Sequence, residues 1–148
     1  MSPFNIKVVK ALLIPVNKKG EVLIQDRENY KPLRWGYFGG SVEVGETVKE
    51  ALIREAKEEL VIDISDAKVV ELGIFEDIIG GKEVRRHTFI MSVDVESFKY
   101  NVQEGKGAKW VSPEEMEDLM KQFASEADVL IARAVSAFLR KDPNLLKT

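Results

Sequence analysis

Residues 39–62 of the chain read GGSVEVGETVKEALIREAKEELVI, and this stretch decides the fold. Its two leading glycines allow backbone conformations that other residues avoid and let main-chain groups approach a ligand closely. Thr47, with Glu50 three residues later, has the pattern of a capping box, and good helix formers follow up to Leu60. The stretch therefore predicts a glycine turn that leads into a helix from about Thr47 to Leu60.

The predicted helix carries acidic side chains on its apolar face. At about 100° per residue, Glu59 lies roughly 20° from Leu52 and Glu55 roughly 60° from it, with Glu58 beside them. Glu55 and Glu59 also repel each other at a spacing of four residues, which costs about 0.2–0.5 kcal/mol. A divalent cation bound by carboxylate oxygens would offset this repulsion. A solvated charged face, or carboxylates that accept backbone hydrogen bonds, would explain the pattern as well.

The segments before this stretch predict strands and a loop. Residues 7–15 form an apolar, β-branched run, and residues 22–24 form another after a turn at 17–20, so the two read as a strand pair. Residues 27–40 are rich in aromatic residues, glycine and proline and are interpreted as a loop.

The segments after the stretch predict more strands and then two helices. Residues 61–77 are strand-rich, and Gly80-Gly81 indicates a hairpin turn. A short strand is expected around Trp110, a helix from Ser112-Pro113 onward, and a last helix over about residues 126–140. This order predicts an α+β fold or a mixed α/β/α sandwich.

The composition limits the class of protein. A chain of 148 residues is expected to form one domain. Its net charge of -3, without a block of basic residues, does not favour binding of a nucleic-acid polymer. The absence of cysteine excludes disulfides, thiolate nucleophiles and cysteine zinc sites. No apolar run is long enough to cross a membrane and no secretion signal is evident, so a cytoplasmic location is expected.

The spacing of Gly40, Glu46 and the run from Arg54 to Glu59 resembles the Nudix box, whose pattern is Gly-x5-Glu-x7-Arg-Glu-U-x-Glu-Glu-x-Gly-U with U apolar. Six specified positions coincide at fixed spacing over 23 residues, and the strands on both sides fit the family's layout. The resemblance implies a Nudix-type α/β/α sandwich with a mixed β-sheet, as a single domain over residues 1–148.

The resemblance also implies roles for the box residues. It implies that Glu55, Glu58 and Glu59 bind Mg²⁺ or Mn²⁺ with the help of the Gly39 carbonyl. The other three box positions, by the same resemblance, are structural: an ion pair of Glu46 with Arg54 orients the loop against the helix, and Gly40 lies in the turn.

The residues implied as catalytic are Glu55, Glu58 and an acid from a later loop. Glu104 is the first candidate for that acid, with Asp77 and Glu76 behind it, and a loop acid in solvent is an equally good explanation of Glu104. Either Glu55 or Glu104 could take the proton from the attacking water.

One box position departs from the family. Val61 stands where the family has glycine, which commonly ends the helix in a left-handed conformation. A β-branched residue would be strained there, so we expect the helix to end by another geometry.

Substrate contacts are assigned to residues outside the helix. Trp35 and Phe38 could stack on a base, although such residues more often pack in a core. Arg27 and Arg86 could contact phosphates through their forked donors, although solvated surface arginines are commoner. His87, the one histidine, is assigned a structural or substrate-contact role in preference to catalysis.

The resemblance implies hydrolysis of a diphosphate linkage in a small nucleotide. The proline expected of ADP-ribose hydrolases and the tyrosine expected of dinucleoside polyphosphate hydrolases are missing near residues 77–80. A nucleoside triphosphate, oxidised or not, is therefore the leading substrate class. The alternatives are another nucleotide derivative, such as a dinucleoside polyphosphate or a nucleotide sugar, and a non-catalytic nucleotide sensor. A homodimer is compatible with the resemblance, because dimers are frequent in the family.

Overall fold

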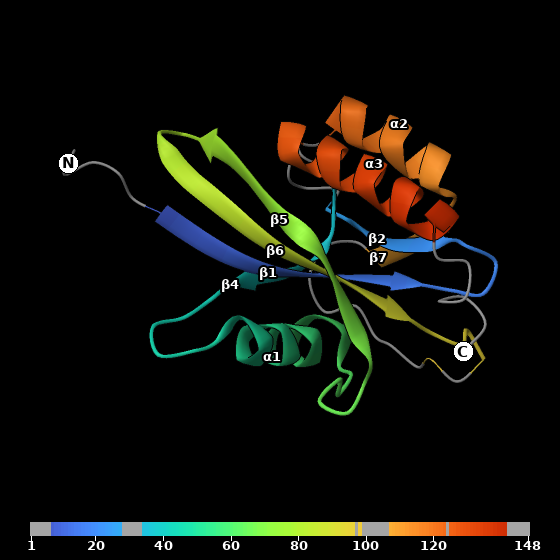
Figure 1. Cartoon of the computed structure of the whole chain (residues 1–148), viewed down its shortest axis with the longest axis horizontal. Coiled ribbons are helices and arrows are strands. Elements are labelled where there is room, and N and C mark those ends of the chain that lie inside the picture. The colour runs from blue at the N-terminus through green and yellow to red at the C-terminus, as the bar shows by residue number, and fades with distance from the viewer. Residues whose placement is uncertain (1–6, 28–33, 97, 99–106, 124, 142–148) are drawn as a thin grey trace.

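The computed structural model consists of one mixed sheet with helices on both faces (Figure 1). It describes residues 7–27, 34–96, 98, 107–123 and 125–141. Helix α1 (Val48–Leu60) lies against one face, and helices α2 (Pro113–Phe123) and α3 (Glu126–Lys141) lie against the other. The predicted α+β fold, an α/β/α sandwich with a mixed sheet, is confirmed. Within the described residues, no helix is long and apolar enough to span a membrane.

Seven strands make up the sheet, with the main order β3-β2-β1-β6-β5. The parallel pair is β1 with β6, and the other pairs are antiparallel, including β4 with β1 and β7 with β2. The strands are β1 (Lys7–Val16), β2 (Val22–Asp26), β3 (Trp35–Gly36), β4 (Phe38–Ser41), β5 (Val69–Ile79), β6 (Lys82–Ser92) and β7 (Gly107–Val111).

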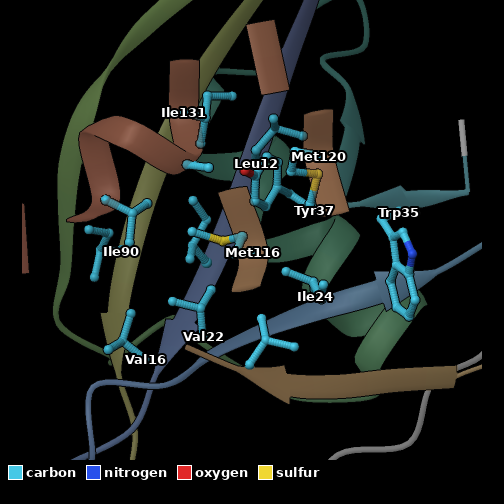
Figure 2. Packing of buried hydrophobic residues seen from close by; sticks show 14 residues of the cluster. Leu12, Val16, Val22, Ile24, Trp35, Tyr37, Ile90, Met116, Met120 and Ile131 are labelled. Carbon is cyan, nitrogen blue, oxygen red and sulfur yellow. The ribbon is translucent and has the colours of Figure 1, made fainter. Parts of the chain in front are cut away.

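Strand β1 divides the core into two clusters. Its side chains alternate between the two faces, as expected of a strand buried on both sides. Leu12 and Ile14 pack toward α2 and α3, whereas Ala11 and Leu13 pack toward α1. Figure 2 shows the first cluster, in which side chains of α2 and α3 meet those of the strands; the labelled members from the helices are Met116, Met120 and Ile131.

Most predicted elements are confirmed, and two boundaries were wrong. The hairpin at Gly80-Gly81 joins β5 to β6, and the capping box of Thr47 and Glu50 begins α1. The expected loop over residues 27–40 was wrong in its second half, because β3 and β4 lie there. Their glycines hid the strand signal, and pairing with β1 and β2 supplies the missing stabilisation. The strand-rich segment 61–77 becomes a strand only at Val69.

The end of α1 contradicts the expected geometry. Val61 adopts the left-handed conformation, with φ 56° and ψ 44°, although it is β-branched. The N–H of Val61 donates to the carbonyl of Lys57 at 3.1 Å, and the N–H of Ile62 donates to that of Ala56 at 3.5 Å, as at a helix end with glycine in this position. The expectation of another helix end was therefore wrong. The helix ends in the left-handed turn of the family, and Val61 adopts this strained conformation. The position is 56% exposed, so the side chain gains little by burial.

Replacing Val61 with glycine is expected to stabilise the protein by roughly 1 kcal/mol. The left-handed conformation costs an ordinary residue about 1–2 kcal/mol, and the greater freedom of glycine in the unfolded chain takes back about 0.5–1 kcal/mol. Urea unfolding would show a higher midpoint at an unchanged slope. Val61→Ala, which keeps most of the strain, should gain less. A Val61→Gly variant less stable than the parent would contradict this account.

Candidate functional site

The glycine turn of β4 lies directly against the acidic face of α1. Glu59 is only 5% exposed, and its Oε2 accepts a hydrogen bond from the backbone N–H of Gly39 at 2.7 Å. The predicted inward orientation of Glu59 is thus confirmed. The alternative of a carboxylate held by a backbone donor is also realised, because Gly39 donates to one oxygen of the group.

Gly40 makes room for the second carboxylate. A Cβ atom at Gly40 would lie 2.5 Å from Oε1 of Glu55, so a larger residue would push this carboxylate away. β4 pairs with β1 such that Gly40 is opposite Ala11, which fixes the turn to the sheet. The glycine thus lets the carboxylate of Glu55 lie directly against the backbone of β4.

Arg54 and Glu46 form the predicted ion pair. Nε of Arg54 donates to Oε2 of Glu46 at 2.6 Å, and Nη2 donates to Oε1 at 3.0 Å, so the contact is bidentate. Nη2 also donates to the carbonyl of Ser41 at 2.9 Å. The hydrogen bond from Arg54 lowers the pKa of Glu46, and the same bond raises the pKa of Arg54. The loop between β4 and α1 is therefore tied to the helix.

Nη1 of Arg54 contacts two of the predicted metal ligands. It donates to Oε1 of Glu55 at 2.9 Å and to Oε2 of Glu58 at 3.2 Å. In this arrangement, no three histidine, cysteine, aspartate or glutamate side chains of the described part converge as a metal site. Glu55 and Glu58 turn toward the guanidinium, and Glu59 turns toward the backbone of Gly39.

The donor set nevertheless fits a hard divalent cation. Carboxylates and a backbone carbonyl are the oxygen ligands that Mg²⁺ and Mn²⁺ prefer. Glu55, Glu58 and Glu59 lie on consecutive turns of α1, next to the Gly39–Gly40 backbone. A buried carboxylate such as Glu59 is costly unless positive charge or several hydrogen bonds compensate it.

The later acids have different outcomes. Glu104 lies outside the described residues, so its role stays a prediction. Asp77 accepts a hydrogen bond from Nη1 of Arg86 at 2.7 Å, and Glu76 faces Arg85 at 3.4 Å. Both of these acids are therefore engaged with arginines of β6.

Arg86 belongs to a polar cluster on the sheet face that carries α3. Its side chain is 5% exposed and lies between Asp77 and Asp128, whose Oδ1 is 3.9 Å from Nε. Burial raises the pKa of Asp128, although the charge of Arg86 opposes this. Burial lowers the pKa of Lys10, and Arg86 adds to the effect. Tyr37, whose pKa burial raises, donates its hydroxyl to the carbonyl of Asp128 at 2.9 Å.

Arg27 lies at the same cluster. Its Nε donates to the Gln25 side chain and its Nη2 to the carbonyl of Tyr37, both at 3.1 Å. A Cβ at Gly36 would lie 2.5 Å from Cζ of Arg27, so this glycine makes room for the guanidinium. The predicted pair Arg27 and Arg86 is thus brought together, with Lys10 as a third cation.

The two predicted stacking residues lie in the core. Phe38 is 1% exposed and packs in the cluster under α1, where its ring offers no face to a base. Trp35 is 6% exposed and packs with the other cluster. Arg34 and Lys109 approach its ring at 5.0 and 5.4 Å from the centroid. The alternative that these aromatic residues serve packing fits both positions.

Sequence reasoning missed Lys10 and Asp128. A lysine inside the apolar run of β1 was the available signal for Lys10. No signal in the sequence pointed to Asp128, because an acidic residue in the first turn of a helix is ordinary. In the structure its backbone N–H donates to Oγ of Ser125 at 3.3 Å.

Comparison with known proteins agrees with this geometry. A curated relative, CTP pyrophosphohydrolase of Escherichia coli, is 27% identical over 142 residues, covering 93% of this chain and 98% of the relative. The solved MutT protein of Methanosarcina mazei superimposes with a TM-score of 0.73 at 23% identity, covering 95% of this chain and 99% of that one. The dihydroneopterin triphosphate pyrophosphohydrolase of E. coli gives 0.72 at 21% identity, with coverage of 93% and 99%. These two likenesses support the fold.

The family itself is decided by the match of residues 7–134 to the model of the NUDIX domain, which spans the sheet, α1 with its glycine turn, and most of α3. The box residues whose geometry is described above all lie within that match. The chain therefore belongs to the Nudix family of pyrophosphohydrolases.

Proposed function

We propose that the chain hydrolyses a nucleoside triphosphate at a diphosphate linkage, giving the monophosphate and pyrophosphate, with Mg²⁺ or Mn²⁺ as cofactor. The observation that carries the proposal is the buried carboxylate of Glu59 beside Glu55 at the Gly39–Gly40 turn. Carboxylates crowded in this way gain most from a cation that also binds phosphate oxygens.

The ligands proposed for the cation are Glu55, Glu58, Glu59 and the carbonyl of Gly39. A cation held by these residues would neutralise charge on the diphosphate and lower the pKa of a bound water. The ion pair of Arg54 with Glu46 keeps the turn and the helix in place during the reaction.

The chemical step needs a carboxylate that accepts a proton. The water oxygen forms a bond to phosphorus, the bond from phosphorus to the bridging oxygen breaks, and the water proton passes to the carboxylate. Glu55 is one candidate, since Gly40 leaves room for its carboxylate beside the turn, and Glu104 is the other.

The cations on the opposite face of the sheet are proposed to contact the substrate. Arg27, Arg86 and Lys10 place three positive groups near two aspartates, which gives this cluster both donors and acceptors for a nucleotide. Lys10 and Arg27 are only half-buried and so remain accessible. The cytidine nucleotide in the relative's name makes CTP the first substrate to test.

A hydrolysis screen tests the proposed function. Nucleoside triphosphates, including CTP and oxidised purines, are compared with dinucleoside polyphosphates and nucleotide sugars, with Mg²⁺, with Mn²⁺ and with EDTA. We expect pyrophosphate release from a triphosphate, and no release in EDTA. Preferred cleavage of a dinucleotide or nucleotide sugar would replace the triphosphate assignment. Turnover that survives EDTA would overturn the metal-dependent mechanism, and tight nucleotide binding without turnover would favour the sensor.

A further inference from the structure

We propose that Arg54 is the resident counter-cation of Glu55 and Glu58 and gives way when these carboxylates bind a divalent cation. Arg54 is thus a positioning residue that limits the metal affinity of the nucleotide-free protein. The inference rests on the proposed function, because it takes both glutamates as metal ligands.

All five N–H groups of the guanidinium have partners, and the partners fall into two sets. Nε and Nη2 donate three hydrogen bonds, to the Glu46 carboxylate and the Ser41 carbonyl. Nη1 donates two, to Glu55 and Glu58. One side of the planar group therefore holds the loop, and the other holds the two proposed metal ligands, with the exposed loop acid Glu43 at 3.7 Å from Nη1 as a weaker partner.

The two sets of bonds can change independently. The bidentate contact to Glu46 is short, and both side chains are mostly buried, at 24% and 18% exposure. The bond to Glu58 is longer, at 3.2 Å, and the Glu58 side chain is 58% exposed. The bond to Glu55 is 2.9 Å long and the Glu55 side chain is 14% exposed, so the bond to Glu58 is the one that breaks first while the loop contacts stay in place.

Oxygens that accept from Nη1 are the same oxygens that a cation would need. Glu55 presents Oε1 and Glu58 presents Oε2 to the guanidinium, and this orientation leaves no converged set of three acids in the described part of the chain. A positive group beside a cation site also lowers its affinity by direct repulsion. Loss of the guanidinium should therefore strengthen metal binding, even though Arg54 is one of the structural positions of the Nudix box.

Titration of the nucleotide-free protein with Mn²⁺, followed by calorimetry, tests this inference. The parent is compared with Arg54→Gln, which removes both sets of contacts, and with Glu46→Gln, which weakens only the loop contact. We expect Arg54→Gln to bind Mn²⁺ about fivefold more tightly, as an ion pair worth about 1 kcal/mol implies. Glu46→Gln should bind no more tightly than the parent. If both variants bind Mn²⁺ equally more weakly than the parent, Arg54 only holds the loop in place and the inference is overturned.

A measurement on the unmodified protein does not depend on how the variants fold. In nitrogen-15 spectra of the arginine side chains, saturation with Mg²⁺ should speed exchange of the Nη1 protons of Arg54 with water, while the Nε proton stays protected. Nη1 protons that are unchanged at saturation would overturn the inference while the proposed function stands. A parent protein that binds no Mn²⁺ at all would instead overturn the proposed function.

Discussion

Glu58→Gln is expected to lower hydrolysis of the preferred nucleotide about 100-fold or more, which corresponds to roughly 2.7 kcal/mol of activation free energy. The amide has one neutral oxygen where the proposed metal site needs an anionic one, so charge on the diphosphate would be neutralised less well. The change should leave stability almost intact, because the Glu58 side chain is 58% exposed. Steady-state rates at several Mg²⁺ concentrations, with unfolding curves beside them, measure both effects.

Glu114→Gln provides the matched control for Glu58→Gln. Glu114 is an exposed acid in the first turn of α2, on the other side of the sheet from α1. We expect its rate and metal dependence to equal those of the parent. If Glu58→Gln also keeps the parental rate, Glu58 is not among the ligands, and the assignment of the acids on α1 must be revised.

Gly39→Ala is expected to destabilise the fold by more than about 3 kcal/mol, or to prevent folding, because a clash adds to backbone strain. The new Cβ would lie 2.0 Å from the carbonyl oxygen of Ala11 and 2.9 Å from Cα of Leu12. Both neighbours are backbone atoms of β1, the strand at the centre of the sheet, so neither can move away cheaply. Gly39 also has φ +135°, which is unfavourable for any other residue. Urea unfolding measures the loss.

Gly45→Ala separates the clash from the backbone strain. Gly45 has φ +87°, but a Cβ there would meet nothing within 4 Å. Its replacement should therefore cost only the conformational strain, about 1–2 kcal/mol. Equal stability of Gly39→Ala and Gly45→Ala would show that β4 and β1 can separate without penalty, contrary to the packing described.

Local sequence signals predicted α1 and its acidic face well. The capping box, the run of helix formers and the rotation of 100° per residue depend only on neighbours along the chain. Burial of Glu59 could therefore be predicted before any tertiary contact was known. The strand pairing of residues 35–41 could not be predicted, because three glycines weaken the strand signal there and the stabilisation comes from β1 and β2.

Candidate site residues divide in the same way. The acids of the box could be predicted because they lie in one short stretch of sequence. The Arg86 cluster could not, because it joins residues from β1, β6, β5 and α3. Tyr37 and Asp128, for example, are 91 positions apart and meet only through the fold. For Phe38 and Trp35 the sequence left base stacking open beside packing in the core, and the fold places both in the core, because burial of an aromatic ring is strongly favourable.

By itself, the sequence determined the helix, its cap, the hairpin and the acids that α1 presents to the glycine turn, since these follow from spacing and local hydrogen bonds. Only the tertiary structure decided how Arg54 divides its donors, why Val61 holds a left-handed turn, and which cations meet on the other face of the sheet. For the cations, the physical reason is that burial and pairing between distant segments bring them together, and neither can be predicted from a local pattern.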